Sequence, residues 1–218
     1  QHEEAATALP LLRQALRNVA HPAIRNRGTT VGSIAHADPA GEMPSVLVLT
    51  DGVVEAVGPG GRREIAATDF FLGPLETSLA DDELVEAVRF TRFGPGTRTA
   101  FLESSRRHGD YALAGVAVAV DVADGVVVSA RAGFVSVTPV PLVLDLTPVL
   151  GGRDAGAPVP DEVTDAVREF VDPEGDIHAT ADYRRMLAAE LTRRALATAT
   201  HPTPAADPAS TTAQESVA

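Results

Sequence analysis

Leucine and valine recur at helical spacing near the start of the chain, where Leu9, Leu12, Leu16 and Val19 share one face. This pattern predicts a helix that ends at His21-Pro22, because a proline disfavours helical conformation in the residue before it. Farther along, valine-rich or alternating segments bounded by turn residues predict strands. These strands are residues 53–57, a short stretch around Glu64 and Ile65, and residues 84–90. Residues 44–49 are compatible with a strand or with a short helix.

The longest β-branched runs are residues 112–122 and 126–137. The residues between them, Ala123-Asp124-Gly125, favour a hairpin turn because Asp and Gly tolerate left-handed backbone. In the first run, valines at even-numbered positions line one face, while Ala117 and Ala119 line the other. We therefore predict an antiparallel pair that is covered on both faces, closely approached on the alanine face, with a helix on one side.

Two amphipathic helices are predicted after this hairpin. The first carries Val163, Val167, Phe170 and Val171 behind Pro160-Asp161-Glu162, and the second carries Tyr183, Met186, Leu187 and Leu191 behind Thr180. Arg184-Arg185 and Arg193-Arg194 then fall on the face opposite the apolar stripe, which predicts a solvated surface.

These elements together predict the α+β fold class. We expect residues 1–95 and 96–198 to form two parts that meet near the turn-rich sequence RFGPGTR. Residues 199–218 are rich in proline and small side chains and have almost no apolar bulk, so we expect a disordered tail there.

Composition narrows the classes of function. The 218 residues include 18 Lys and Arg against 30 Asp and Glu, a net charge of −12 that disfavours a nucleic-acid or anionic-membrane surface. No apolar run is long enough to span a membrane and the start lacks the pattern of a signal peptide, so we expect a cytoplasmic location. The sequence has no cysteine, which excludes disulfides, thiol catalysis and cysteine-held clusters on this chain. Redox chemistry would require a bound organic cofactor.

The segment IRNRGTTVGSIAHADPAGEMP, residues 24–44, concentrates small, hydroxyl-bearing and charged side chains. It matches neither the GxGxxG dinucleotide loop nor the GxxxxGK[ST] phosphate loop. The small residues from Gly28 to Ser33 would let backbone N–H groups approach a phosphate closely. An ordinary tight loop explains the same composition, and the residue types leave both interpretations open.

Other polar clusters give weaker signals. His36, Asp38 and Glu42 lack an established metal-ligand spacing and Pro39 prevents one helix from aligning them, so we predict no metal site. The charged sequence RRHGD, residues 106–110, is interpreted as a solvated or locally paired cluster that could contact a partner. The G-x-S-x-G pattern of a nucleophile elbow is absent, so we predict no catalytic residue.

Residues 24–44 resemble the second flavin-binding segment of the FAD subunits of molybdenum hydroxylases, the family that includes aerobic carbon monoxide dehydrogenase and xanthine dehydrogenase. The resemblance continues through DFFLGPLETSLADDELVEAVRF, AFLESSRRHGDYALAGVAVAV and HATADYRRMLAAELTRRAL, and covers residues 8–198. It implies the C-terminal part of a PCMH-type (vanillyl-alcohol-oxidase-like) FAD-binding domain. An α+β domain with an antiparallel sheet and packed helices would follow it.

The resemblance also implies which residues contact the cofactor. The family's T-x-G-G-[SN] contacts to FAD fall on Thr29, Thr30, Val31, Gly32 and Ser33, followed by His36 and Glu42. In the family, an acidic residue at the Glu42 position lies close to the flavin, and an aliphatic residue at the Val85 position packs near the isoalloxazine ring. Two positions depart from the pattern. Val31 replaces a common glycine, and Leu102 stands where some members place a flavin-contacting lysine.

The function implied is that of an oxidoreductase subunit. FAD on this chain would receive electrons from the [2Fe–2S] clusters of a small partner subunit, which takes them from the molybdenum cofactor of a large one. We therefore expect a hetero-oligomer, with NAD, quinone and oxygen all open as acceptors. Family members begin with another subdomain whose Ala-Gly-Gly loop wraps the FAD pyrophosphate, and nothing upstream of Gln1 supplies it, so we expect weak FAD binding by this chain alone. The alternative is a flavin-free scaffold or interaction module of such a complex.

Overall fold

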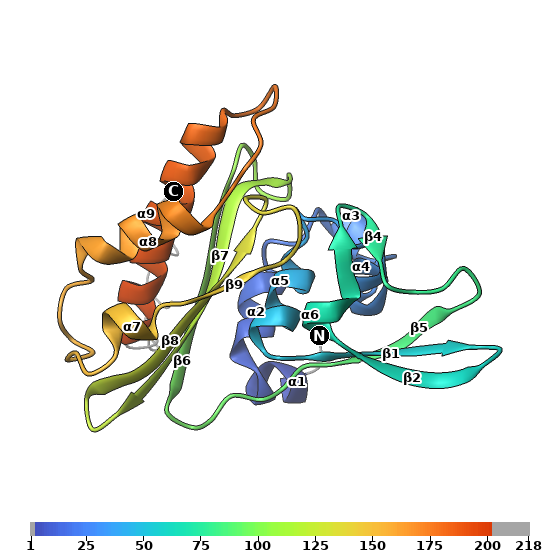
Figure 1. Ribbon diagram of the computed structural model, residues 1–218, viewed down its shortest axis with the longest axis horizontal. Helices are drawn as coiled ribbons and strands as arrows, with labels where there is room; N and C mark the ends of the chain where they lie inside the picture. Colours follow the sequence, from blue (N-terminus) through green and yellow to red (C-terminus); the bar gives the residue numbers. More distant parts are fainter. Residues whose placement is uncertain (1–2, 202–218) are drawn as a thin grey trace, which may run out of the picture.

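The computed structural model describes residues 3–201 as helices and sheets arranged around one central antiparallel sheet (Figure 1). The helices are α1 (Glu3–Ala8), α2 (Pro10–Leu16), α3 (Pro22–Arg25), α4 (Thr30–His36), α5 (Glu42–Leu49), α6 (Ala67–Phe70), α7 (Thr147–Leu150), α8 (Asp161–Phe170) and α9 (Ala181–Thr200). The strands are β1 (Val53–Gly58), β2 (Gly61–Ala66), β3 (Phe71–Gly73), β4 (Glu76–Thr77), β5 (Leu84–Arg89), β6 (Thr97–Ser105), β7 (Ala112–Ala123), β8 (Val126–Val135) and β9 (Val143–Asp145). The predicted α+β class is confirmed.

The central sheet has four antiparallel strands in the order β6-β7-β8-β9. Its core is the predicted hairpin, in which β7 and β8 are joined by a turn with positive φ at Asp124 (51°) and Gly125 (78°). A second, three-stranded sheet has the order β2-β1-β5, and β3 and β4 form a short separate ribbon. The predicted strands of the first half therefore exist, whereas β6 and β9 were not predicted.

Each face of the central sheet is covered by helices, as the valine and alanine alternation predicts (Figure 1). On one face Val116, Val118 and Val120 pack in a core with buried side chains of α8 and α9. On the other face Ala117 and Ala119 belong to a core that includes α2, α5 and β1. The sheet is thus shared between two hydrophobic cores. The predicted boundary near residue 95 lies in a segment without helix or strand and stays a prediction.

Small residues allow α5 to lie close against the sheet. A Cβ built on Gly133 of β8 would lie 2.9 Å from Ser45 Oγ and 3.4 Å from Leu49 Cβ, both on α5. Residues 44–49, which the sequence left undecided, are helical, and every residue of α5 from Met43 to Leu49 is buried. A helix with apolar residues on every side is typical of a fully buried position.

Gly133→Ala is expected to lower the free energy of unfolding by about 1–2 kcal/mol, because the added methyl group forces α5 away from β8. Chemical denaturation measures the change. Gly60→Ala is the matched control, since a Cβ on Gly60 meets no atom within 4 Å. Equal stability of the two variants would contradict the close approach.

The start of the chain and the region after it differ from the predicted single helix and open loop. The predicted helix corresponds to α2, which ends at Leu16 instead of His21-Pro22, and Ala20 has a positive φ of 43°. Helix α1 precedes it and was not predicted. Within residues 24–44 the chain forms the second half of α3, all of α4 and the start of α5. Helices this short form in proteins mainly through tertiary packing, which sequence periodicity does not report.

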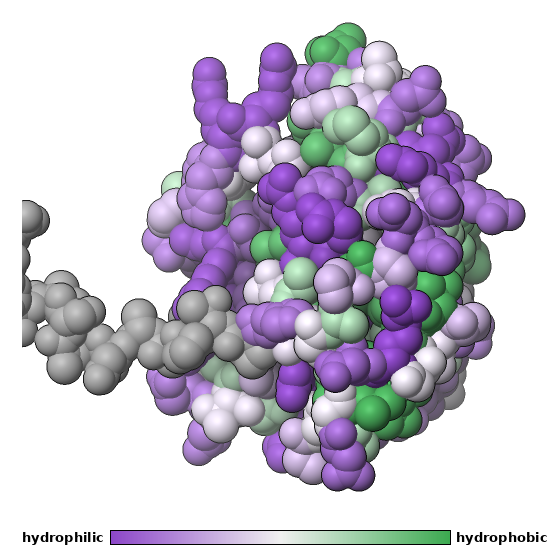
Figure 2. Space-filling model, turned by 90° about the vertical axis from the view of Figure 1, so that its left-hand side faces the viewer, coloured by the Kyte–Doolittle hydropathy of each residue, from purple (hydrophilic) through white to green (hydrophobic). Residues whose placement is uncertain are grey.

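Helix α9 buries only part of its predicted stripe. Leu191 is buried and Leu187 packs against the core, as predicted, whereas Tyr183 and Met186 are exposed. Ala188 and Leu196, outside the predicted stripe, complete the buried face. Small residues pack against the sheet because they permit a close approach. The outward surface of the helical layer is mainly hydrophilic (Figure 2). Helix α9 also continues through Thr200 with Ala199 buried, so the predicted tail does not begin at residue 199. The rest of the predicted tail lies outside the described residues.

Candidate functional site

Three short helices shape the segment that the sequence singled out. The N-cap of α4 is Thr29, whose Oγ1 accepts a hydrogen bond of 2.9 Å from the Gly32 backbone N–H. Helix α4 ends at Ala37, which has a left-handed φ of 53°. Asp38 Oδ1 then accepts a 2.8 Å hydrogen bond from Ala40 N–H, and this turn leads into α5 at Glu42. Local capping therefore fixes the directions of α4 and α5.

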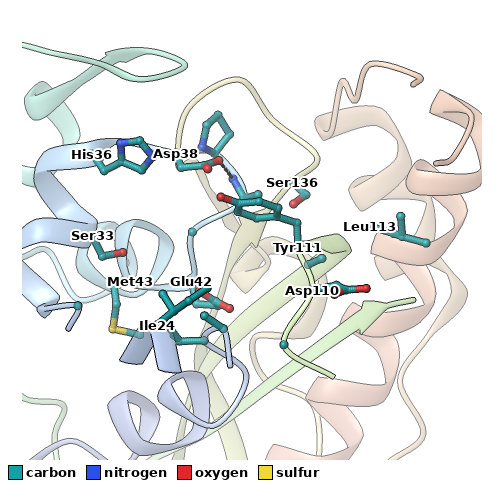
Figure 3. A pocket seen from close by; sticks show the side chains of 18 of the residues that line it. Ile24, Ser33, His36, Asp38, Glu42, Met43, Asp110, Tyr111, Leu113 and Ser136 are labelled. Carbon is teal, nitrogen blue, oxygen red and sulfur yellow. Dashed lines mark hydrogen bonds between the residues drawn. The ribbon is translucent and has the colours of Figure 1, made fainter. Parts of the chain in front are cut away.

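The segment lines an open groove with a volume of about 1700 Å³. One wall consists of α3, α4 and the turn before α5, and the other consists of residues 109–113, Ser136, Thr138, Pro139 and the loop of residues 172–176. Figure 3 shows side chains from both walls pointing into this space. Residues distant in sequence therefore contribute to one site. Its volume exceeds the roughly 300–1,000 Å³ of a typical small-molecule pocket.

Most of the predicted cofactor residues lie together in this groove. Those that line it are Thr29, Thr30, Gly32, Ser33, His36 and Glu42. Val31 of α4 and Val85 of β5 are not among the lining residues. Val85 pairs with Ala56 of β1 and packs at the margin of the core. The assignment of these eight residues as FAD contacts stays a prediction.

Sequence reasoning did not select three groove residues that the fold brings in. Tyr111 is 72% exposed, lines the groove and reaches toward Asp38 (Figure 3). Ser136 has a positive φ of 63°, and its buried Oγ has no hydrogen-bond partner in the described structure. Arg184 reaches the groove from α9. The sequence could have drawn attention to Tyr111, because it is one of only two tyrosines. No local pattern indicates that Ser136 or Arg184 lies in the groove.

The interpretation of Arg184 as a solvated residue is wrong. Arg184 is only 7% exposed, and its Nη1 donates a 2.7 Å hydrogen bond to the Leu113 carbonyl oxygen. Nη2 donates to Asp176 Oδ2 at 2.7 Å, while Asp176 Oδ1 accepts from the backbone N–H groups of His178 and Ala179. Arg184 therefore ties the loop that forms one wall of the groove to the start of β7. Arg185, Arg193 and Arg194 have outward positions, as predicted.

Arg184→Met is expected to lower the free energy of unfolding by about 1–2 kcal/mol, because two charge-assisted hydrogen bonds are lost while the apolar packing is largely kept. Hydrogen exchange of the His178 and Ala179 amides should accelerate. Arg185→Met is the matched control, since its ion pairs are with exposed Asp172 and Asp182 and such pairs contribute little. Unchanged exchange in Arg184→Met would contradict the tie.

Burial changes the acidity of two carboxyl groups, that of Glu42 at the groove and that of Glu103 on β6. Burial raises the pKa of Glu42 to about 7, and the nearby charge of Asp38 adds to this effect. Burial likewise raises the pKa of Glu103 to about 7, with a contribution from the charge of Glu42. The negative charge of Asp38 is also the main cause that raises the pKa of Tyr111. The groove thus combines the half-buried Glu42 carboxyl with an exposed aromatic ring.

The charged cluster of residues 106–110 divides between surface and groove. Arg106, Arg107 and His108 are exposed, and Arg106 lines the groove. Asp110 lies 3.8 Å from His21 Nε2, so its nearest basic partner comes from the other wall rather than from its own segment. Between residues 3 and 201, no group of three or more His, Asp or Glu side chains is placed to hold a metal ion. No helix in that range is both long and apolar enough to cross a membrane.

The residues present fit an elongated ligand with a phosphate-like end and a planar ring. Thr30 and Ser33, which line the groove, carry hydroxyl groups that can form hydrogen bonds, and Gly32 between them adds no side chain. Tyr111 offers an exposed aromatic face. Such a combination of apolar surface and a few convergent polar groups is typical of cofactor sites.

Two protein families match the chain in sequence. The family described as FAD binding domain in molybdopterin dehydrogenase matches residues 1–91, and the one described as CO dehydrogenase flavoprotein C-terminal domain matches residues 99–199. The chain is 40% identical to the nicotine 6-hydroxylase medium subunit of Paenarthrobacter nicotinovorans, over 88% of this chain and 67% of that protein. It is 34% identical to the carbon monoxide dehydrogenase medium chain of Hydrogenophaga pseudoflava, over 86% of this chain and 66% of that protein.

Solved structures of related enzymes are also similar to this chain. Carbon monoxide dehydrogenase from Hydrogenophaga pseudoflava matches with a TM-score of 0.84 and 33% identity, over 90% of this chain and 69% of that chain. Quinoline 2-oxidoreductase from Pseudomonas putida 86 matches with a TM-score of 0.81 and 32% identity, over 92% and 70%. The chain spans about two thirds of the length of the relatives that it matches.

Proposed function

This chain belongs to the family of FAD-binding medium subunits of molybdenum hydroxylases, and from that premise we propose that it carries FAD and transfers electrons within such an oxidoreductase complex. The observation that carries the proposal is the groove, because it brings Thr29, Thr30, Gly32, Ser33 and Glu42 together with Tyr111 from the other wall. The bound FAD would supply the redox chemistry, and the protein would supply its position and surroundings.

Different residues of the groove would hold different parts of the cofactor. Hydroxyl groups of Thr29, Thr30 and Ser33 would bind the polar, phosphate-bearing part, with Gly32 permitting close contact. Tyr111 would pack against a planar ring, and the loop held by Arg184 would limit access of water from the second wall. No side chain of this site is assigned as a catalytic acid, base or nucleophile.

The partners follow from the same proposal. A flavin that receives electrons needs a donor nearby, and this sequence has no cysteine with which to hold an iron–sulfur cluster. We propose a complex with an iron–sulfur subunit and a molybdenum-binding subunit. The acceptor and the oxidised substrate would depend on the complete complex.

Purification of the complex from its natural host, by a tag on this subunit, tests the assignment. We expect FAD in one-to-one ratio with the subunit, visible by its absorbance, together with molybdenum and iron by metal analysis. A complex with both metals but no flavin would support the alternative scaffold role. If the co-purified proteins include neither a molybdenum protein nor an iron–sulfur protein, the proposed electron-transfer role is refuted.

A further inference from the structure

A histidine of the first wall of the groove packs against the loop that leads into the second wall. A Cβ built on Gly109 would lie 2.6 Å from His21 Nδ1 and 2.8 Å from His21 Cε1, so the imidazole ring contacts this glycine directly. His21 Nε2 also lies 3.8 Å from Asp110 Oδ1. All three residues line the groove. The contact therefore joins the segment after α2 to the segment before β7.

The backbone on each side of this contact has an uncommon conformation. The φ angle is 43° at Ala20 and 89° at Gly109. A positive φ is unfavourable for residues that carry a Cβ, whereas glycine adopts it readily. At Gly109 a side chain would meet both the His21 ring and the Ala20 carbonyl carbon, which lies 3.2 Å from the built Cβ. Left-handed backbone at a residue such as Ala20 persists only where surrounding contacts hold it. The close approach of these two segments is therefore a defined feature of the fold.

The His21 side chain is not used for local capping. His21 is the N-cap of α3, but its side chain makes no cap hydrogen bond, and its backbone carbonyl oxygen accepts from the N–H groups of Ile24 and Arg25. The ion pair with Asp110 joins two well-exposed side chains, and such pairs contribute little. Packing of the imidazole ring on Gly109 is therefore the main part of the contact.

The loop that His21 contacts, residues 106–110, leads directly to Tyr111. Inside the loop, the Asp110 N–H donates a 3.1 Å hydrogen bond to the Arg107 carbonyl oxygen. Of the ion pairs between residues 3 and 201, only the one with His21 involves this loop. Tyr111 itself is 72% exposed, so little packing restrains its ring. The position of Tyr111 therefore depends on how well the loop is held.

We propose that His21 is a positioning residue, which holds residues 109–111 against the first wall and so keeps Tyr111 extended toward Asp38 across the groove (Figure 3). Where it concerns FAD, the proposal rests on the proposed function, in which Tyr111 packs against a planar ring. A side chain that is ordered before binding loses less conformational freedom when the ligand arrives. His21 would therefore strengthen FAD binding through Tyr111. The contact itself is a property of this chain and is testable without a cofactor.

Tyrosine fluorescence anisotropy tests the contact on the 218-residue chain without FAD. The sequence has two tyrosines and no tryptophan, so Tyr183→Phe leaves Tyr111 as the dominant emitter. In this background His21→Ala should lower the anisotropy of Tyr111, because the loop moves more freely. His21→Phe, which keeps a ring on Gly109, should retain most of the native anisotropy.

His108→Ala is the matched control for the anisotropy, because His108 is an exposed histidine of the same loop. It should leave the anisotropy of Tyr111 unchanged. Equal anisotropy with and without the His21 side chain would overturn the proposal that His21 orders Tyr111. Loss of anisotropy in His21→Phe as large as in His21→Ala would contradict ring packing as the main part of the contact.

A double-mutant cycle in the natural complex tests the link to FAD, with the FAD dissociation constant measured by equilibrium dialysis. His21→Ala should weaken FAD binding about two- to tenfold, which corresponds to the cost of ordering one side chain on binding. In a Tyr111→Ala background the same substitution should have almost no effect, because the group that His21 positions is absent. His108→Ala should leave the affinity unchanged in both backgrounds.

Equal weakening by His21→Ala in both backgrounds would overturn the proposal, since it would show that His21 supports the groove without acting through Tyr111. A natural complex that contains no flavin would instead refute the proposed function and with it the role toward FAD. The anisotropy of the ligand-free chain would then still decide whether His21 orders Tyr111.

Discussion

The stability of Glu42→Gln relative to the native, ligand-free chain is expected to increase by roughly 2–3 kcal/mol between pH 5 and pH 8. In the folded protein burial raises the pKa of Glu42 from 4.5 to about 7. Unfolding returns the group to its ordinary value, so the folded state binds the proton more tightly. The stabilisation from this carboxyl is complete below pH 4.5 and is lost as the pH rises through 7. Glutamine removes the titrating group and with it this loss.

Urea denaturation of native protein and variant at pH 5, 6, 7 and 8 measures the effect. Carboxylates with lowered pKa values do not interfere, because Glu83, Asp176 and Glu190, each with a pKa of about 2, lose their contributions only as the pH falls below 4.5. Groups unaffected by the substitution cancel in the difference between the two proteins, whereas Glu103, whose pKa the charge of Glu42 raises, contributes a further gain in the same direction. Glu169→Gln is the control, because Glu169 is exposed on α8. Parallel curves for native protein and Glu42→Gln would show that Glu42 ionises normally in the folded chain.

Gly32→Val is expected to weaken FAD binding more than tenfold in the natural complex while the fold is retained. A Cβ at this position lies 3.0 Å from Thr29 Oγ1, the atom that accepts the hydrogen bond of the Gly32 N–H. Valine adds two further methyl groups in the groove and pushes against the Thr29 side chain that caps α4. The hydroxyls that would bind the cofactor are displaced together with the cap.

Equilibrium dialysis against FAD measures the affinity, and circular dichroism measures the retained fold. Gly60→Val makes the same chemical change in the turn between β1 and β2, where an added Cβ meets nothing within 4 Å, and should leave the affinity unchanged. If a folded Gly32→Val protein binds FAD with native affinity, residues 24–44 are better interpreted as an ordinary tight loop.

Hydrophobic periodicity was most informative where one residue pattern decides both conformation and burial. The alternating valines and alanines of β7 predicted a strand with two covered faces, and Asp124-Gly125 predicted its turn, because only residues that tolerate positive φ close so tight a hairpin. The resemblance of residues 24–44 indicated the family. In these cases the information is local in the chain.

The sequence was less informative about the helices α5 and α9, whose packing depends on distant parts of the chain. Residues 44–49 permitted strand or helix, and only the core around Met43 and Leu49 decided for α5. For α9, large apolar residues suggested one buried face, but the sheet is contacted by small ones such as Ala188 and Ala195. Hydrophobicity alone does not report how closely two elements approach, and here closeness determined the orientation.

The sequence by itself determined the α+β class, the central hairpin, the lack of any cysteine ligand and one wall of the groove, because each follows from neighbouring residues. Only the tertiary structure decided the second wall. It buried Arg184 against Leu113 and Asp176, and it brought Tyr111 to Asp38. These contacts join residues far apart in the sequence, such as Leu113 and Arg184, which are 71 positions apart. Their partners, burial and charge arise from the packing of helices on the sheet, which no local pattern encodes.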